Sequence, residues 1–396
     1  MELLISAGQV LPGPAGRRVL DGAVLVRDSA IVAVGDRAEV GRLAGADAER
    51  RDFPDATLLP GLIDCHVHLA FDASPDPVAA VQGHDEATLF EEMAARARRL
   101  LDTGVTTVRD LGDRDGLAVR LRESIAEGRL PGPRVLAATA PLTVPDGHCW
   151  FFGGVVDGKD AIRTMVRRNA AAGADVIKVM ATGGGLTKGG AAIWESQFSA
   201  EELRCVVAEA HDVGLPVASH AHGSEGIAAS VAAGVDTIEH CTWMAEGGFD
   251  VREDVVAEIA ARGIHVCPGA SPNWRGFAER FGQERAMEIF GRVRWMAEQG
   301  VRLIAGTDAG VPRAVFDNLT GSLEFFDFLG FELDRILELA TVDAATGIGL
   351  GDSTGRLAEG YRADLLVVEG DPLTELDALR EPVLVLAAGR PHVPGS

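Results

Sequence analysis

The sequence predicts an α/β fold, a (β/α)8 TIM barrel with a small β-sandwich domain formed by the N- and C-terminal segments. Two observations predict it. One helix–glycine–strand phrase recurs through the middle of the chain, and both ends contain short β-type runs without helical spacing. The 396 residues are enough for a barrel of roughly 250 to 300 residues with an attached module.

The recurring phrase consists of a helix-like segment, a glycine, and a short run rich in Val, Ile and small side chains. Glycine suits a helix end because the backbone there takes a positive φ, and a short apolar run suits a strand covered on both faces. Six glycines occupy this position: Gly104, Gly173, Gly214, Gly234, Gly263 and Gly300. Strands at 56–68 and 133–140 bring the number to eight, which closes a barrel. The alternative, a doubly wound open sheet, normally begins with a glycine-rich phosphate turn, which is absent here.

The ends of the chain differ from its middle. Runs such as LLISAG near the start and ADLLVV near the finish are broken by Gly and Asp and are typical of short strands. We therefore expect residues 1–57 to form the N-terminal part of the β-sandwich, 58–354 to form the barrel, and 355–396 to complete the sandwich.

The composition restricts the partners. The formal net charge of −22 would repel a phosphate backbone and an anionic membrane surface, so we expect a small-molecule substrate and neither nucleic acid nor membrane. The five cysteines contain no CxxC pair, the first residues do not have the basic and apolar pattern expected of a leader, and no apolar run is long enough to span a bilayer. These features favour a cytoplasmic protein, with a homo-oligomer left open.

Side chains of metal-binding type stand where the predicted strands end, which is where a (β/α)8 barrel carries its chemistry. They are His66 and His68 on the first strand, Lys178 on the fourth, His220 and His222 on the fifth, His240 on the sixth, and Asp308 after the eighth. Because strand side chains alternate, His66 and His68 should point to the same side. The sequence therefore predicts a site at the barrel mouth.

The donor types indicate divalent cations. Imidazole and carboxylate groups suit Zn²⁺, with Mn²⁺ or Fe²⁺ as alternatives. An ammonium group beside two cations would be repelled, so Lys178 should be neutral, and a neutral lysine can react with carbon dioxide to give a carbamate. A carboxylated Lys178 could then bridge two metal ions. A buried ion pair with a barrel carboxylate is the competing role for this lysine.

Longer motifs contain these residues, namely LLPGLIDCHVHL, GVTTVRDLG, GADVIKVMATGG, ASHAHG, GVDTIEH, GTDAG and GRLAEGYRADLLVV. On these motifs the sequence resembles the amidohydrolase superfamily, and in particular its binuclear metal-dependent branch with imidazolonepropionase-like and prolidase-like members. The resemblance implies that His66 and His68 bind the more buried metal with Lys178 and Asp308. It also implies that carboxylated Lys178, His220 and His240 hold the second metal.

The expected reaction is hydrolysis of a C–N amide bond by a hydroxide that bridges the two metals. Asp308 would accept the proton and pass it to the leaving nitrogen, although an Asp here could instead cap a helix. His222, or His148 in the loop PDGHCWFFGG, would stabilise the oxyanion or hold a substrate carboxylate. Structural hydrogen bonds are the competing roles for both histidines. Arg109 is expected to be a structural ion-pair partner.

The expected substrate is a small amide that carries an apolar or aromatic group and a carboxylate, such as an N-acyl amino acid or an Xaa-Pro-type dipeptide. An apolar wall is predicted from the aromatic residues of the loops, namely Trp150, Phe151, Phe152, Trp194, Trp243 and Trp274, with four of the five tryptophans near the mouth. The groups predicted to meet the carboxylate are His148, Arg275 and Arg313. Prolidase-like members often have a Tyr where this chain has His222, which weakens the expectation of dipeptide specificity.

Three other functions compete with amide hydrolysis. A bridging hydroxide can also attack lactones or phosphotriesters. A mononuclear imidazolonepropionase-like ring hydrolase would have no need of Lys178. A non-catalytic assembly protein that kept the fold would normally have lost ligand positions, whereas all of them are present here.

Overall fold

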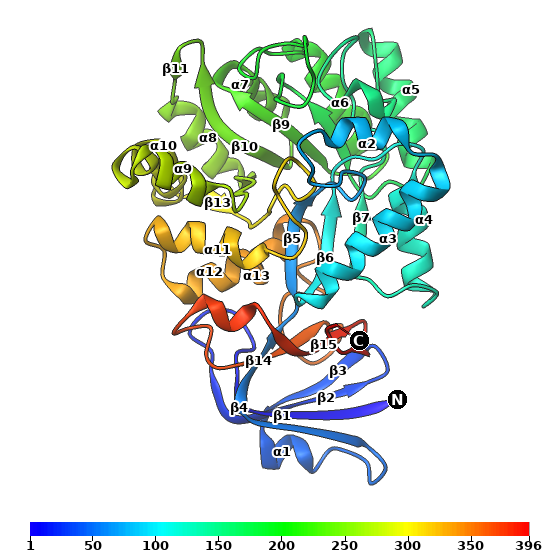
Figure 1. The fold of residues 1–396 in the computed structure, drawn as a ribbon, viewed down its shortest axis with the longest axis vertical. Coiled ribbons are helices and arrows are strands. Elements are labelled where there is room, and N and C mark those ends of the chain that lie inside the picture. Colours follow the sequence, from blue (N-terminus) through cyan, green and yellow to red (C-terminus); the bar gives the residue numbers. More distant parts are fainter. Residues whose placement is uncertain (396) are drawn as a thin grey trace.

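The computed structural model describes residues 1–395. A seven-stranded sheet lies at one end of the molecule and contains both ends of the chain, while alternating strands and helices form the larger part (Figure 1). The chain starts in the seven-stranded sheet, enters the larger part through β5, and returns to the sheet at β14.

The terminal sheet joins the first and last parts of the sequence. Its strands are β1 (Glu2–Val10), β2 (Val19–Arg27), β3 (Ala30–Asp36), β4 (Glu49–Pro60), β14 (Leu365–Glu369), β15 (Pro382–Ala387) and β16 (Arg390–His392), with the short helix α1 (Arg37–Gly41) after β3. The pairing of β1 with β4 is parallel, and all other pairs are antiparallel. Apolar side chains such as Ile5, Val24, Leu58 and Val367 form its buried cluster.

The predicted β-sandwich is not confirmed, because the seven strands pair within one sheet. The long strand β4 lies between β1 and β14, so hydrogen bonds connect the N-terminal strands directly to the C-terminal ones. The register of β1 against β4 shifts at Gly8, where a Cβ atom would lie 2.2 Å from the carbonyl oxygen of Pro54. Glycine therefore allows the two backbones to approach closely at this irregularity.

The larger part contains two parallel sheets. The first consists of β5 (Leu62–Val67), β6 (Val105–Asp110) and β7 (Arg134–Ala137). The second consists of β8 (Ile177–Met180), β9 (Val217–Gly223), β10 (Thr237–Ala245), β12 (His265–Cys267) and β13 (Arg302–Leu303), with the short strand β11 (Gly248–Phe249) antiparallel to β10. The six predicted helix-ending glycines all have positive φ, between 68° and 91°. This prediction is confirmed, and it explains how each helix ends just before the next strand begins.

Helices connect and cover these strands. They are α2 (Pro77–Gly83), α3 (Glu86–Asp102), α4 (Leu117–Ala126), α5 (Gly158–Ala171), α6 (Ala200–Asp212), α7 (Ser224–Ala233), α8 (Glu253–Arg262), α9 (Trp274–Phe281), α10 (Gln283–Glu298), α11 (Leu319–Phe328), α12 (Leu333–Leu339) and α13 (Val342–Gly347). Two short 3-10 turns are η1 (Trp150–Phe152) and η2 (Leu376–Leu379). Among residues 1–395, no helix combines the length and the apolar character needed to cross a membrane.

The predicted closed barrel is not confirmed either, since the strands pair as two sheets. Individual backbone hydrogen bonds cross between the sheets. The Leu142 amide donates to the Lys178 carbonyl at 2.8 Å, and the Cys65 amide donates to the Ala305 carbonyl at 3.0 Å. The last strand, β13, has two residues and the segment after it is irregular, so no regular ladder joins it to β5. The structure is thus an α/β fold with parallel sheets.

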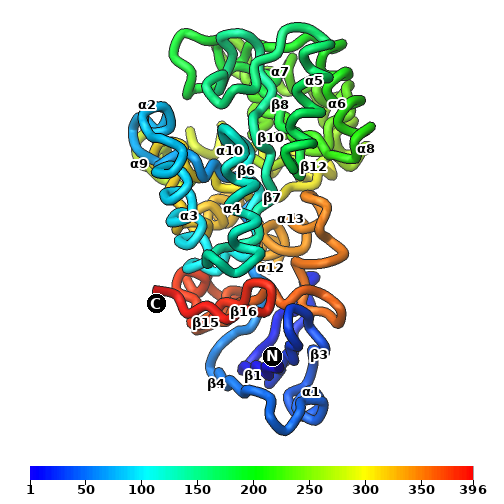
Figure 2. Tube along the Cα trace, turned by 90° about the vertical axis from the view of Figure 1, so that its right-hand side faces the viewer, coloured from blue at the N-terminus to red at the C-terminus, as the bar shows by residue number. Residues whose placement is uncertain are grey.

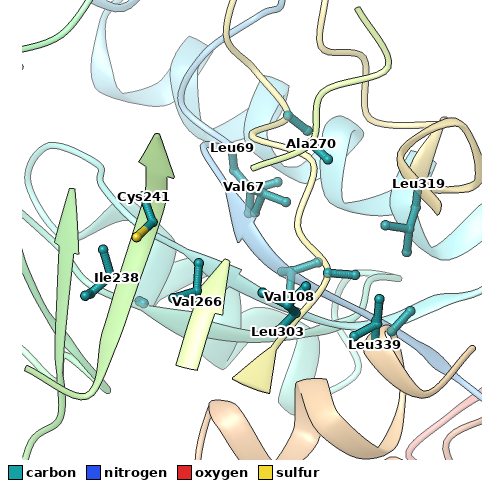
Figure 3. Close-up of a cluster of buried hydrophobic side chains, with 14 of the residues drawn as sticks. Val67, Leu69, Val108, Ile238, Cys241, Val266, Ala270, Leu303, Leu319 and Leu339 are labelled. Atoms are coloured by element: carbon teal, nitrogen blue, oxygen red, sulfur yellow. The ribbon is translucent and has the colours of Figure 1, made fainter. Parts of the chain in front are cut away.

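Apolar side chains from both sheets pack into one core. Figure 3 shows Val67 and Val108 from the first sheet beside Ile238, Val266 and Leu303 from the second, all of them at most 1% exposed. At the other end, Arg390 of β16 donates hydrogen bonds to the Ile125 and Ala126 carbonyls where α4 ends. Figure 2 shows β15 and β16 between the rest of the terminal sheet and the larger part. A cation at a helix C-terminus satisfies free carbonyls. The terminal sheet is thereby fastened to the helices of the larger part.

A glycine in the segment after β13 gives a stability prediction. A Cβ atom on Gly306 would lie 2.5 Å from Cys267 Sγ and 2.9 Å from His66 Cβ. We expect Gly306→Ala to lower the free energy of unfolding by about 1–3 kcal/mol, as overpacking a core does. Urea denaturation measures the change. Gly41→Ala in α1 is the control, because a Cβ atom there meets nothing within 4 Å; equal stability of the two variants would contradict the prediction.

Candidate metal centre

A pocket of about 670 Å³ opens where the parallel strands end. The sequence-predicted site residues that line it are His68, His148, Lys178, His220, His222, His240 and Asp308. His66 lies beside them and is 1% exposed. The structure therefore brings the residues from the ends of separate strands into one region.

The first group of candidate ligands combines β5 with the segment after β13. The Nε2 atoms of His66 and His68 are 3.3 Å apart, and each lies 3.4 Å from Asp308 Oδ1. Asp64 supports this group, because its Oδ1 accepts hydrogen bonds from the amides of His66 at 3.2 Å and Thr307 at 3.0 Å. One atom from each of His66, His68 and Asp308 lies within 4.8 Å of the others, so the group could hold a metal ion.

Glu239 belongs to the support of this group, and the sequence analysis missed it. Its Oε2 lies 2.9 Å from His66 Nδ1, while its Oε1 accepts hydrogen bonds from Arg109 Nη2 at 2.8 Å and Thr237 Oγ1 at 2.7 Å. Burial favours the neutral acid, but Arg109 and His66 together hold the pKa of Glu239 well below its usual range. An acidic residue inside the apolar strand run TIEH was the available signal. Arg109 has the predicted geometry of an ion-pair partner.

The second group consists of His220 and His222 from β9 and His240 from β10. One ring nitrogen of each lies within 4.8 Å of the others, and the rings of His222 and His240 stack with centroids 4.3 Å apart. Burial lowers the pKa of His222 to about 4 and places the pKa values of His220 and His240 well below the usual range. These imidazoles are therefore neutral at pH 7, the form that binds metals. His222 thus lies among the candidate ligands, although the sequence predicts a role in substrate contact for it.

The backbone of β10 is distorted where it carries His240. His240, Cys241 and Trp243 have positive φ values of 69°, 52° and 58°, and the register against β9 shifts between His240 and Met244. Non-glycine residues rarely adopt this conformation, and such strain is concentrated at functional sites. Asp308 shares it, with a φ of 57°. Both groups of candidate ligands therefore include a residue on a strained backbone.

Lys178 is fully buried between these groups and the core. It is 0% exposed, and its Nζ has no hydrogen-bond partner among the described residues. The competing role as a buried ion pair is therefore absent from the described part of the chain. Burial lowers the pKa of Lys178 to about 8, so a fraction of the amine is neutral at pH 7. An unpartnered, partly neutral amine next to histidine and aspartate donors fits the chemistry of a carbamate ligand.

His148 lines the pocket above His220. The two ring centroids are 4.8 Å apart, and His148 Nδ1 lies 3.3 Å from Thr187 Oγ1. A Cβ atom on Gly184 would lie 2.4 Å from His148 Nε2, so glycine makes room for the ring. Burial lowers the pKa of His148 to about 3, which makes the ring neutral at pH 7.

The predicted tryptophan wall is wrong for three of its four members. Trp243 is completely buried, with its Nε1 donating to Met296 Sδ at 3.3 Å, because β10 continues as far as Ala245. Trp150 and Trp194 are 45% and 37% exposed, and neither is among the described residues that line the pocket. The aromatic residues that line it are Phe249, Trp274, Phe277, Phe290 and Phe325.

The cationic residues in the pocket wall also differ from those predicted from the sequence. Arg275 Nη2 donates to Glu324 Oε2 at 2.5 Å, and neither Arg275 nor Arg313 lines the described pocket. Arg292 of α10 does line it. The sequence could not distinguish Arg275 from Arg292, since the placement of these two side chains depends on the path of α9 and α10.

Comparison with known proteins places this arrangement in a family. The model of the amidohydrolase family matches residues 57–391. The chain is 28% identical to an ochratoxinase of Aspergillus niger, over 96% of this chain and 84% of that protein. It is 26% identical to an imidazolonepropionase of Mesorhizobium japonicum, over 92% and 90%.

Solved structures agree with the sequence relatives. A Xaa-Pro dipeptidase with bound methionine superposes with a TM-score of 0.86 at 27% identity, covering 99% of this chain and 100% of that one. The A. niger ochratoxinase structure gives a TM-score of 0.86 at 26% identity, covering 100% and 96%. Because the family match extends through both groups of candidate ligands, the chain belongs to the amidohydrolase family and is a hydrolase of carbon–nitrogen bonds.

Proposed function

We propose that the protein is a metal-dependent amidohydrolase that cleaves the amide bond of a small substrate carrying a carboxylate, either an N-acyl amino acid or an Xaa-Pro-type dipeptide. The observation that carries the proposal is the convergence of two candidate ligand groups beside the unpartnered amine of Lys178. Similarity to a Xaa-Pro dipeptidase and to an ochratoxinase supports hydrolysis of this bond type.

The proposed ligands come from the two groups, with the exception of His222, which is given a role in substrate contact below. His66, His68, Asp308 and carboxylated Lys178 would hold one divalent cation, and His220, His240 and the same Lys178 would hold the other. Zn²⁺ suits these nitrogen and carboxylate donors, and Mn²⁺ or Fe²⁺ are the alternatives. When bound, the cations supply a Lewis acid for the scissile carbonyl and a source of hydroxide near neutral pH.

Asp308 is the proposed acid–base group. Although burial favours its protonated form, His66, His68 and Lys178 hold the pKa of Asp308 below its usual value. Its carboxylate is therefore ionised at neutral pH, able to accept a proton from water and to deliver it to the leaving nitrogen. Without that proton the leaving group would be an amide anion, which is a very poor leaving group.

His222 and His148 are the proposed catalytic hydrogen-bond donors. Thr242 Oγ1 lies 3.0 Å from His222 Nδ1, and Thr187 Oγ1 lies 3.3 Å from His148 Nδ1. The Thr187 hydroxyl can donate to His148 Nδ1, and the Thr242 hydroxyl can donate either to His222 Nδ1 or to the His222 carbonyl at 3.3 Å. Donation to Nδ1 leaves the proton of the neutral ring on Nε2. A neutral donor facing the pocket can stabilise the oxyanion that develops on the carbonyl oxygen.

We also propose that residues 58–354 act as one barrel, with 1–57 and 355–396 forming a separate terminal module. The hydrogen bonds from Leu142 to Lys178 and from Cys65 to Ala305 support the barrel, because they cross both boundaries between the parallel sheets. The pairing of β4 with β14 supports the module.

Ring hydrolysis is the second candidate function. The relationship to imidazolonepropionases favours it, since the imidazolonepropionase match covers most of both chains. A mononuclear site of that kind would leave Lys178 without a role, although its amine is buried and unpartnered. This residue therefore favours the binuclear amidase.

The proposed function predicts metal-dependent release of an amine. Protein loaded with Zn²⁺ or Mn²⁺ should hydrolyse members of a panel of N-acyl amino acids and Xaa-Pro dipeptides, and removal of the metal by a chelator should abolish turnover until metal is restored. Amine release detected by mass spectrometry measures this. If the loaded protein cleaved lactones or phosphotriesters but none of the amides, the proposed bond type would be wrong.

The role of Asp308 predicts a large loss in turnover. Asp308→Asn keeps the size of the side chain but removes the proton acceptor, so we expect kcat to fall by about 10²-fold or more. Steady-state kinetics gives the change, and elemental analysis of the same samples verifies that metal is still bound. Near-normal kcat at normal metal content would remove Asp308 from acid–base catalysis.

A further inference from the structure

Arg292 is a guanidinium group in the wall of the metal-site pocket, and the mechanism proposed above does not use it. Among the described residues that line the pocket, it is the one arginine. Its Cζ lies 3.7 Å from the centroid of the Phe249 ring, and its Nη1 donates to the Ile289 carbonyl at 2.8 Å. Stacking and a single backbone bond hold the group in place and leave its other N–H donors free.

No carboxylate within residues 1–395 forms an ion pair with Arg292; Glu288, one turn earlier on α10, attracts the guanidinium electrostatically but forms its ion pair with Arg285. Other arginines nearby are paired, since Arg275 contacts Glu324 and Arg294 contacts Glu298 at 3.0 Å. Burial also lowers the pKa of the Arg292 guanidinium, which shows that its charge is partly removed from solvent. A partly desolvated cation without a counter-ion favours binding of an anion at that position.

The surroundings of Arg292 specify what the anion carries. α9 and α10 contribute Trp274, Phe277 and Phe290 to the pocket wall next to it. The candidate metal ligands, represented by His240 and Asp308, line the same pocket. A ligand that reaches both regions places its reacting polar group at the metal site. At the α9–α10 wall it places an apolar group and, beside that group, a negatively charged group that meets Arg292.

We propose that Arg292 binds the substrate carboxylate, and that the wall formed by α9 and α10 receives an aromatic or large aliphatic side chain beside it. This inference rests on the proposed function and refines it: the substrate class becomes N-acyl derivatives of apolar amino acids. Arg292 takes the role that the sequence suggested for Arg275 and Arg313. Its planar donors can bind both oxygens of a carboxylate, which an ammonium group cannot do in the same way.

The test compares N-acetyl-L-phenylalanine with N-acetyl-2-phenylethylamine, which has the same amide and ring but no carboxylate. Metal-loaded wild type should prefer the carboxylate compound by about 10-fold or more, in kcat/KM or, without turnover, in Kd by calorimetry. Arg292→Gln should abolish that preference without changing the value for the neutral compound, mainly through KM. Arg292→Lys should retain part of it.

Arg280→Gln is the matched control, because Arg280 is exposed on α9, lies over the Phe281 ring, and does not line the described pocket. It should behave as wild type. Undiminished preference in Arg292→Gln, equal loss for both compounds, or no preference in wild type would each overturn the role of Arg292. Failure of the proposed function is distinguishable, since calorimetry would still show the charge preference while neither compound was hydrolysed.

Discussion

Arg109 and Glu239 form an ion pair that is almost completely removed from water, with side chains 3% and 0% exposed. Buried charges are costly unless every donor and acceptor is satisfied. Here Arg109 also donates to the Cys65 carbonyl at 2.8 Å and to Thr237 Oγ1 at 3.0 Å, so the pair connects β6 with both β5 and β10. Because Glu239 also contacts His66 Nδ1, it turns the Nε2 atom of that ring towards His68 and Asp308. The arrangement of the first ligand group therefore depends on an ion pair that contacts His66 through Nδ1, and not through the Nε2 atom that faces His68 and Asp308.

The backbone around the pocket is irregular because side chains from separate strands must point to one place. His240 and Asp308 stand at positive φ, and a regular strand would direct both side chains elsewhere. Gly269 lies opposite, where a Cβ atom would be 3.0 Å from His240 Nδ1. Several polar groups lie within a few ångströms of one another in this site. The strained backbone at the ligand positions and the glycine at the neighbouring position 269 both result from this crowding.

The candidate ligands could be predicted from the sequence for two reasons. Side chains alternate along a strand, and the carboxyl ends of parallel strands meet at one edge of the sheet. His66 and His68 illustrate this, since an i, i+2 pair on a strand must share a side. Glu239 was missed because it lies within a strand, where apolar residues are expected, and its partner Arg109 is distant in sequence. Trp243 was misplaced because β10 continues through an irregularity as far as Ala245, and the indole is buried in the core instead of lying in a loop.

The architecture of the ends and of the pocket wall was harder to predict for a different reason. A sandwich and a single curved sheet have the same alternation along each strand, and the pairing of β4 with β14 distinguishes them. The wall depends on the path of α9 and α10, which composition does not specify. Arg275 and Arg292 both lie in helical segments of the sequence, but Arg275 pairs with Glu324 and Arg292 lines the pocket.

The state of the Lys178 amine tests the binuclear account most directly, because in the proposed function this group, once carboxylated, would join the two candidate ligand groups. A high-resolution crystal structure of protein grown with Zn²⁺ and bicarbonate gives the measurement. The account predicts planar carbamate density on Lys178 Nζ, with one oxygen on each of two metal ions held by His66, His68 and Asp308 and by His220 and His240. A bare Lys178 amine beside a single tightly held ion, in crystals of active enzyme, would contradict it.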